Sequence, residues 1–456
     1  MPQLTKRVGT CGRRSVLRTA GFASGVLGLA LGGCGLPGGA GTANENPTSS
    51  GPVQAKILTF NNALFQNAKD DFVAALAEVD PKLQPDIIVF PGQINQFREK
   101  VLAMYAGGDI PDAQWIHPSI TSLMGSRKLL RPLDEFARKD KDTPLKEFYP
   151  GLMDYLRWQN TTYALPWYST GYAWAFNRDL YQRMGVTPPD QLEKQGKWTW
   201  DEFVSNMRSM TRGTPGSPDR TIGSDNHSMA LDWACAWIWR NGGDVFSKDM
   251  KKVVLNEPAS IEAIQSLADL YLKHQAVNYG PHRTDFTDGF FSGRIGLRHM
   301  NKENTAPDRN DLVKATFSLG MVPVYKGKAG RVNRMAALGF GAAQGAPNGD
   351  AGWRWVRFMG GPKAAAILLR RGSTLPVRPS FQQLPEFAQS MQPWENKDYW
   401  LDSAATARAL PQPASYNDIA NLWMETWDAI LAQKGPAKSL MDDMVRQANS
   451  VLAQEQ

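Results

Sequence analysis

The chain has 456 residues, of which 42% are hydrophobic, 10% aromatic and 21% charged. These fractions match ordinary globular proteins and argue against a wholly disordered chain, a collagen-like fibre and a polytopic membrane protein. Five units of the formal net charge of +7 come from residues 1–33, which carry no acidic residue. The small charge of the remainder gives no basis for binding nucleic acid through its phosphates, so no nucleic-acid partner is expected.

Residues 1–33 have the features of an export signal. Arg13 and Arg14 form a twin-arginine pair, an apolar stretch follows over residues 20–31, and two glycines precede Cys34. The apolar stretch is too short and too rich in glycine to span a bilayer. The residues before Cys34 resemble a bacterial lipobox, in which the cysteine carries lipid; the alternative is a chance Gly-Gly-Cys in an ordinary cleaved signal. We expect a signal peptide over residues 1–33 and a lipid anchor on Cys34.

Residues 34–52 are predicted to form a flexible tether, because they are rich in Gly, Pro and Ser and offer almost nothing to bury. A lipid followed by such a tether indicates a folded body held near a membrane partner. Cys11 falls in the segment to be removed and Cys34 would carry lipid, which leaves Cys235 in the mature chain. No intrachain disulfide is therefore expected, despite export.

The first part of the body alternates predicted strands and helices. Apolar runs at residues 55–60, 86–90 and 111–116 predict strands, and apolar residues at helical spacing over 68–79 and 94–104 predict helices between them. This alternation is typical of a parallel α/β sheet. Ligands commonly bind where such strands end, which singles out Asn61, Asn62, residues 91–93 and residues 115–117, which begin with Trp115.

The middle of the chain does not continue this alternation of predicted strands and helices. Residues 163–166 and 171–177 are predicted to be extended, with residues 167–170 as a break between them. Thr199 and Glu202 fit a capping box that opens a helix, and residues 257–274 form a marked amphipathic helix. The chain after about Leu384 is mostly helical in pattern.

No motif in the sequence supports catalysis, a metal or a cofactor. The five histidines are not at zinc-ligand spacing, and there is no HExxH, CxxC, Gly-x-Ser-x-Gly elbow or P-loop. Gly339, Gly341 and Gly345 do not have the spacing of a dinucleotide fingerprint, so a hinge or a close backbone approach is favoured there. A glycoside-hydrolysing pair of carboxylates stays open, because any two acids could converge in the fold.

The aromatic residues carry more information. Flat rings can cover the apolar faces of a ring-shaped polar ligand, while amide, carboxylate and guanidinium groups take its hydroxyls. Trp115, Trp167 and Tyr168 fall at predicted loop or hinge positions, and Trp233 and Trp237 lie four residues apart on one helical face. Ordinary core packing is the alternative for each single ring.

A series of motifs runs along almost the whole body. Its members are YALP at 163–166, FNRDL at 176–180 and WTWDEF at 198–203, with LRPLDEF at 130–136, FFSGRIGL at 290–297, GMVPV at 320–324, GFG at 339–341 and LPVRP at 375–379. In this order the motifs resemble the family 1 extracellular solute-binding proteins, the maltose- and glycerol-phosphate-type receptors of ABC importers. Residues 299–304 stand where that family often has Gly-x-Trp, so Tyr416 or Trp423 could supply the missing ring.

The resemblance implies an α/β, two-lobe periplasmic-binding-protein-like fold of class II type, with a ligand cleft between the lobes that closes by hinge motion. The N-terminal lobe would comprise residues 53–168 and 339–376, and the C-terminal lobe residues 169–338 and 377–456. The chain would cross between the lobes near residues 169–172, 336–338 and 376–380. The implied ligand-binding residues are Asn61, Asn62, Trp115, Tyr168, Ser169, Trp233, Gly339, Phe340 and Arg378. Arg378 could bind a ligand oxygen or pair structurally at a hinge.

The predicted function is that of an extracytoplasmic, lipid-anchored and monomeric receptor. It would capture a small polar solute, with a sugar as the favoured class, and deliver it to the transmembrane subunits of an ABC permease without a covalent step or a cofactor. Two alternatives stay open: a sensor that presents its ligand to a membrane signalling protein, and an exported carbohydrate-active enzyme. Mono-, di- and oligosaccharides, sugar phosphates and polyols all fit as ligands.

Overall fold

The computed structural model describes residues 51–225, 228–279, 286, 288–306 and 311–455. The predicted signal peptide, Cys34 and the tether up to residue 50 lie outside the described residues. Residues from Ser49 onward form one compact unit, and the description below concerns that unit alone. Within its described part, no helix combines the length and the apolar character needed to cross a bilayer.

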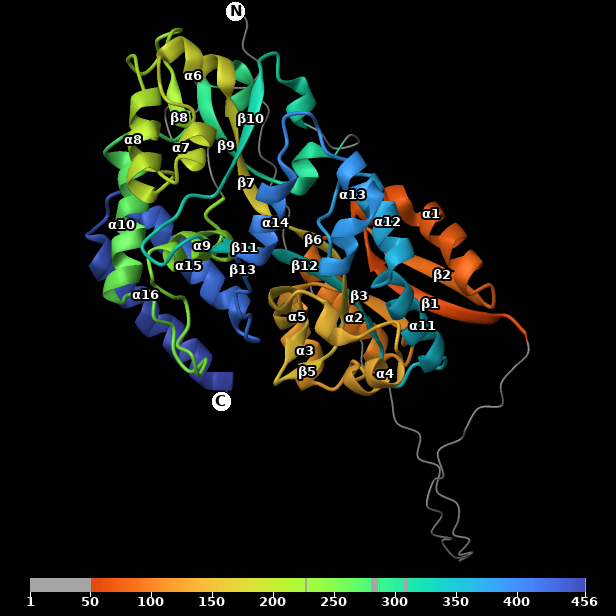
Figure 1. Ribbon diagram of the computed structural model, residues 1–456. Helices are drawn as coiled ribbons and strands as arrows, with labels where there is room; N and C mark the ends of the chain where they lie inside the picture. Colours follow the sequence, from red (N-terminus) through yellow and green to blue (C-terminus); the bar gives the residue numbers. More distant parts are fainter. Residues whose placement is uncertain (1–50, 226–227, 280–285, 287, 307–310, 456) are drawn as a thin grey trace, which may run out of the picture. The chain divides into compact units, whose positions relative to one another are not determined.

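A five-stranded mixed sheet forms the first half of the unit (Figure 1). In spatial order its strands are β2 (Leu83–Phe90), β1 (Val53–Phe60), β3 (Ala113–Ile116), β12 (Ala336–Ala342) and β6 (Leu165–Thr170). β1 pairs in parallel with β2 and β3, as the sequence predicted. β12 comes from far along the chain and inserts antiparallel between β3 and β6. The predicted break at residues 167–170 is wrong, because these residues continue β6 and pair with β12.

Helices cover this sheet. They are α1 (Ala63–Val79), α2 (Ile94–Ala106), α3 (Pro118–Ser126), α4 (Asp134–Lys139), α5 (Pro150–Tyr155), α11 (Gly349–Met359) and α12 (Pro362–Arg370), with the small hairpin of β4 (Arg157–Trp158) and β5 (Thr161–Thr162) beside them. α11 packs on β12, β1 and β3. A Cβ added at Gly352 would lie 2.1 Å from the carbonyl oxygen of Asp112, so this helix approaches the sheet too closely for any side chain there.

A second, four-stranded sheet forms the other half. Its strands are β10 (Leu319–Pro323), β7 (Tyr172–Asn177), β9 (Ile295–Asn301) and β8 (Ile222–Ser224). Its helices are α6 (Arg178–Met184), α7 (Pro189–Lys194), α8 (Trp200–Met210), α9 (Leu231–Arg240), α10 (Pro258–Leu272), α15 (Tyr416–Leu431) and α16 (Ala437–Leu452). Thr199 caps α8 as predicted, accepting a hydrogen bond from the amide of Glu202 at 3.4 Å. The predicted amphipathic helix is α10.

The chain passes between the sheets at adjacent places. Gly171 alone separates β6 from β7, and Met335 alone separates β11 (Asn333–Arg334) from β12. β11 pairs in parallel with β13 (Ala407–Arg408). The side-chain amide of Asn333 donates to the carbonyl oxygen of Tyr172 at 2.8 Å. A Cβ at Gly171 would lie 1.9 Å from the Ser403 hydroxyl, so glycine is required by the close approach.

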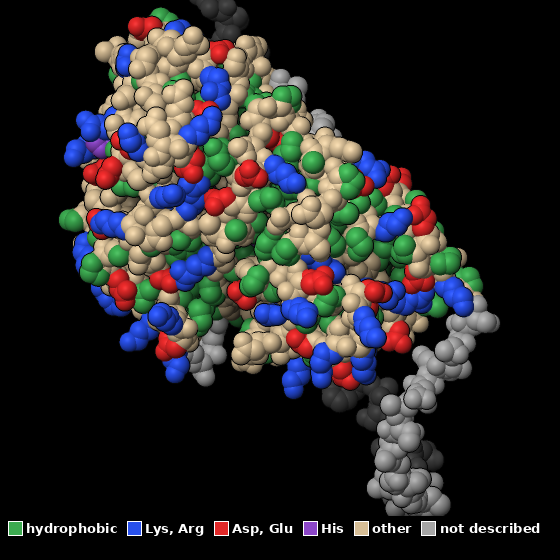
Figure 2. Space-filling view, in the orientation of Figure 1, with side chains coloured by type: hydrophobic (Ala, Val, Ile, Leu, Met, Phe, Trp, Pro, Cys, Tyr) green, Lys and Arg blue, Asp and Glu red, His purple; other side chains and the backbone are tan. Residues whose placement is uncertain are grey.

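The segment between α12 and β13 contains α13 (Pro385–Gln389) and α14 (Lys397–Ala405). Near its start, the carbonyl oxygen of Val377 accepts from the amide of Tyr149 at 3.3 Å, beside the first sheet. β13 runs alongside β11, and the backbone amide of Leu375, just before the predicted crossing at residues 376–380, donates to the carbonyl oxygen of Ser169 in β6 at 2.9 Å. The predicted lobe boundaries stay predictions. On the face shown in Figure 2, Lys and Arg side chains are intermixed with Asp and Glu.

Candidate functional site

Five aromatic and polar side chains gather where the chain passes between the sheets. We call them the crossing cluster: Tyr172, Asp232, Trp233, His299 and Arg334. They come from the start of β7, the first turn of α9, the end of β9 and the end of β11. Because these elements are distant in sequence, only the pairing of β7 with β9 and the position of β11 beside Tyr172 bring them together.

Arg334 is the charged centre of this cluster. Its Nη2 lies 2.8 Å from a carboxylate oxygen of Asp232, and its guanidinium carbon lies 4.8 Å and 4.7 Å from the ring centroids of Tyr172 and Trp233. The residue is only 7% exposed, yet its Nε and Nη1 have no hydrogen-bond partner among the described residues. A buried donor without a partner is costly, so these N–H groups favour an oxygen supplied by a ligand.

The rings of the cluster form a compact aromatic group. The centroids of Tyr172 and Trp233 are 4.7 Å apart at 68°, and His299 stacks on Tyr172 at 5.5 Å and 20°. Tyr172 and His299 share one face of the sheet as diagonal neighbours of the β7–β9 pair. Tyr172 is buried, whereas Trp233 is half-buried. Trp233 is therefore the ring of this pair that can cover the apolar face of a ligand.

The electrostatics of the cluster follow from burial and from Arg334. Burial lowers the pKa of Arg334, but the neighbouring Tyr172 and Asp232 outweigh burial and raise it above its usual value. Burial, followed by the positive charge of Arg334, lowers the pKa of His117 to about 4. At neutral pH Arg334 is therefore positively charged, and the nearby imidazole of His117 is uncharged.

A second polar contact links the two sheets nearby. The Tyr168 hydroxyl, from β6, donates a hydrogen bond to the carboxylate of Glu303, which follows β9. Burial of Tyr168, and then the charge of Glu303, raise the pKa of this phenol well above its ordinary value. The phenol thus stays protonated and joins the two halves of the unit.

Four of the predicted site residues lie in three different settings. Trp233 is in the crossing cluster, and Tyr168 makes the contact with Glu303 just described. Asn61 is exposed at the end of β1, and the side chain of Asn62 caps α1 by accepting from the amide of Leu64 at 2.8 Å. These positions are at the carboxyl end of a parallel strand, as predicted.

Four other predicted residues are packed inside the first half of the unit. Trp115 is 2% exposed and stacks on Phe60 at 5.1 Å. Phe340 is fully buried against the ring of Trp167 at 5.7 Å. The hydroxyl and the amide of Ser169 bond to residues 374–375, and a Cβ at Gly339 would lie 2.9 Å from that of Ala164. The structure does not bring these four into the crossing cluster.

Arg378 is held by the protein itself. Its two terminal nitrogens donate to the carbonyl oxygens of Asp142 at 3.2 Å and Gly360 at 2.7 Å, and its guanidinium lies 4.2 Å from the centroid of Phe148. Burial lowers its pKa to about 10. These contacts favour the structural one of its two predicted roles.

The sequence did not single out Tyr172, His299, Glu303 or Arg334, although Asp232 stood beside a predicted tryptophan. No local pattern marks them, because each is isolated on its own strand or turn. Of the two proposed substitute rings, Trp423 is fully buried and its indole donates to the carbonyl oxygen of Met229 at 2.6 Å. Tyr416 is 7% exposed, and burial, followed by the charge of Asp232, raises its pKa, so it lies near the cluster.

The described residues contain no group of three or more His, Cys, Asp and Glu placed to hold a metal ion. Cys235 is buried as a free thiol, and its burial raises its pKa above the ordinary value. The chemistry offered by the crossing cluster is therefore ring stacking and hydrogen bonding to a polar ligand.

Comparison with known proteins gives a consistent result. The sequence pattern of the bacterial extracellular solute-binding proteins matches residues 82–366. A curated relative is the sn-glycerol-3-phosphate-binding periplasmic protein UgpB of Agrobacterium fabrum, which is 22% identical over 227 residues. That alignment covers 45% of this chain and 46% of UgpB, so the chain spans about half the length of this relative in the match.

Solved structures agree over a larger share of the chain. An ABC substrate-binding protein of Listeria monocytogenes, in complex with cycloalternan, has a TM-score of 0.73 at 18% identity and covers 88% of this chain and 99% of its own. UgpB of Mycobacterium tuberculosis, in complex with glycerophosphocholine, has a TM-score of 0.69 at 16% identity and covers 89% and 99%. These likenesses confirm the predicted two-lobe α/β fold. With the family pattern spanning more than half of its length, the chain belongs to the bacterial extracellular solute-binding proteins.

Proposed function

We propose that this protein is the receptor of an ABC importer, that it binds a sugar or a related small polyhydroxylated solute, and that the crossing cluster holds this ligand. The observation that carries the proposal is the pairing of a half-buried Trp233 with Arg334, whose Nε and Nη1 lack partners among the described residues. A ring face and unpaired donors side by side suit a solute with an apolar ring face and polar edges.

The relatives support this class of solute. The name of the Agrobacterium UgpB refers to glycerol-3-phosphate, the Mycobacterium UgpB is in complex with glycerophosphocholine, and the Listeria protein is in complex with cycloalternan. Polyols, their phosphates and saccharides are therefore the classes to test. A charged guanidinium donates hydrogen bonds to hydroxyl and phosphate oxygens alike. Membership of an extracellular family implies an extracytoplasmic location. Lipid on Cys34 and delivery to a permease belong to the proposal.

Ligand capture would proceed by closure of the two halves about Gly171, Met335 and the neighbouring β13. A closed state is favoured only to the extent that the ligand makes contacts there that it lacks in the open state. Donors from β11 and a ring from α9 are supplied by different elements, so a ligand that bridges them would draw these elements together.

The test is thermal unfolding of the purified protein against a panel of sugars, polyols and glycerol phosphates. A ligand that binds only the folded state should raise the free energy of unfolding by about 2.7 kcal/mol at a hundred times its dissociation constant. Trp233→Ala and Arg334→Gln should each weaken binding at least about tenfold, whereas the exposed control Arg446→Gln should not.

Four results would contradict the proposal. A flat panel, after unfolding and mass analysis have shown that no ligand co-purified, would exclude this class of solute. Wild-type affinity in folded Trp233→Ala and Arg334→Gln would move the site away from the crossing cluster. Consumption of a bound compound would indicate an enzyme. Cross-linking to a membrane signalling protein instead of a permease would favour the sensor.

A further inference from the structure

Two carboxylates accompany the single guanidinium of the crossing cluster. The carboxylate of Asp232 is paired with Nη2 of Arg334 at 2.8 Å. The second carboxylate belongs to Glu303, which follows β9 by two residues, and the last residue of β9, Asn301, lies opposite Tyr172 in the β7–β9 pair. Burial raises the pKa of Tyr172 and Arg334 opposes this rise, while the charges of Asp232 and Glu303 add to it. Both carboxylates therefore lie close to the Tyr172 phenol.

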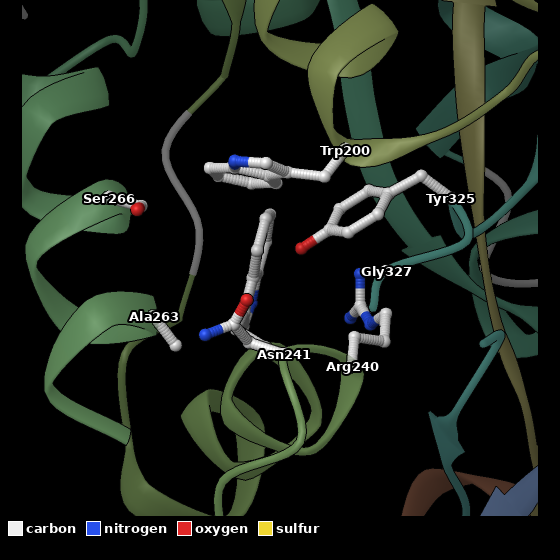
Figure 3. A pocket seen from close by; sticks show the side chains of 8 residues that line it. Trp200, Arg240, Asn241, Ala263, Ser266, Tyr325 and Gly327 are labelled. Carbon is white, nitrogen blue, oxygen red and sulfur yellow. The ribbon is translucent and has the colours of Figure 1, made fainter. Parts of the chain in front are cut away.

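Neither end of α9 adds a positive group that a solute could reach. Asp232 lies in the first turn, so its own carboxylate occupies the positive end of the helix dipole. In the last turn, Arg240 hydrogen-bonds the side chain of Tyr325, and the two side chains lie beside each other in Figure 3. The cavity at this place encloses about 20 Å³, which is room for about one water molecule. Arg240 is therefore closed to a solute.

The other basic side chains of the crossing segments have carboxylate partners. They are Arg331 with Glu193 at 2.7 Å, Lys302 with Glu395 at 2.8 Å, and Arg408 with Asp244. His117 is uncharged at neutral pH, because burial and then the charge of Arg334 lower its pKa to about 4. The charged donors that these segments leave for a ligand are thus Nε and Nη1 of Arg334, which have no partner among the described residues.

Hydroxyl groups match this set of side chains better than phosphate oxygens do. A hydroxyl both donates and accepts, so a polyhydroxylated solute can accept from Arg334 and also donate to the carboxylates of Asp232 and Glu303. A phosphate ester is anionic at neutral pH and its phosphate oxygens act as acceptors. Its phosphate would give these carboxylates no donor and would be repelled by both.

We propose that the crossing cluster selects an uncharged polyhydroxylated solute over the phosphate ester of the same solute, and that Glu303 is a residue that sets this specificity. The inference rests on the function proposed above, because it concerns the same site. Arg334 offsets the charge of Asp232, so Glu303 supplies the negative charge that remains. The hydroxyl of Tyr168 donates to the Glu303 carboxylate and holds it in place.

The test is isothermal titration calorimetry of the purified protein with matched pairs of compounds. The pairs are glycerol and glycerol 3-phosphate, glucose and glucose 6-phosphate, and trehalose and trehalose 6-phosphate. We expect an uncharged member to bind and its phosphate ester to bind at least about tenfold more weakly, because of the repulsion by the carboxylates.

Glu303→Gln tests the assigned residue. Glutamine keeps an oxygen that can accept from Tyr168 but removes the charge, so the preference for the uncharged member should fall by about tenfold. Glu425→Gln removes the same charge from an exposed position of α15 and should leave the preference unchanged. Thermal unfolding checks that both variants are folded.

The possible failures are distinguishable. A phosphate ester that binds as tightly as its parent compound would overturn this inference and leave the receptor function standing. An unchanged preference in folded Glu303→Gln would overturn the assignment of Glu303. Saturable binding of inorganic phosphate below about 10 mM that Arg334→Gln abolishes would overturn the selection without any Glu303 variant. If no member of any pair binds, the proposed function fails, and this inference fails with it.

Discussion

The ammonium nitrogen of Lys302 lies 2.8 Å from a carboxylate oxygen of Glu395, and both side chains are completely buried. Lys302 follows β9, and its backbone amide donates to the Thr170 hydroxyl at the end of β6, at 3.1 Å. Glu395 precedes α14, which packs on β7 and β10. The pair thus links the segment after β9, the end of β6 and the start of α14 next to the crossings.

Breaking this pair from one side should be strongly destabilising. Lys302→Met leaves the carboxylate of Glu395 buried without a counter-charge and should lower the free energy of unfolding by about 3–5 kcal/mol. The double variant Lys302→Met/Glu395→Leu removes both charges and should recover most of that loss. Urea denaturation measures both. A double variant as unstable as Lys302→Met would show that the charge left behind is not the cause.

The low pKa of His117 makes stability depend on pH. Its folded-state pKa of about 4 lies below the ordinary 6.5, so between these pH values the unfolded chain binds a proton that the folded chain does not. Stability should therefore be full above pH 6.5 and fall by about 2 kcal/mol as the pH drops toward 4, since His117 is half-buried and partly screened.

A matched variant isolates this effect. The His117 ring caps α3 by accepting from the amide of Ser119 at 3.2 Å, and asparagine can make the same cap without titrating. His117→Asn should flatten the stability curve between pH 4 and 6.5 in urea titrations. An unchanged curve would assign the acid sensitivity to other groups.

Trp115 and Trp233 should respond differently to truncation. Trp115→Ala removes a ring that is 2% exposed and should lower the free energy of unfolding by about 3–5 kcal/mol. Trp233 is half-buried, so Trp233→Ala should cost only about 1–2 kcal/mol and act mainly on ligand affinity. Paired urea and ligand titrations separate the two. If both variants lost the same free energy of unfolding, Trp115 and Trp233 could not be assigned to the core and to the ligand site, respectively.

Lipid attachment can be tested on the thiol of Cys34. Cys34→Ser should release the protein from the membrane fraction and remove the mass of the lipid from its mature N-terminus, because a hydroxyl cannot form the thioether. Cys235→Ser, at a buried thiol, is the matched control and should stay membrane-bound. Recovery of the wild-type protein in the soluble fraction, like Cys34→Ser, would favour the simple cleaved signal over the lipobox.

The sequence by itself determined the elements whose cause is local. The apolar runs of β1 and β2, the helical spacing of α1, α2 and α10, and the cap of α8 can all be read from neighbouring residues. The order of its motifs determined the family and the two-lobe fold. It also singled out Trp233, which lies in the crossing cluster.

Only the tertiary structure decided the rest of the site. A tryptophan looks the same in sequence whether it is packed in a core, as Trp115 is, or half-exposed beside a buried charge, as Trp233 is. Arg334 and His299 have no local signal, because their roles depend on contacts with residues more than a hundred positions away in the sequence. The physical reason is that burial and the absence of a partner are properties of the packed neighbourhood, which no local stretch of sequence contains.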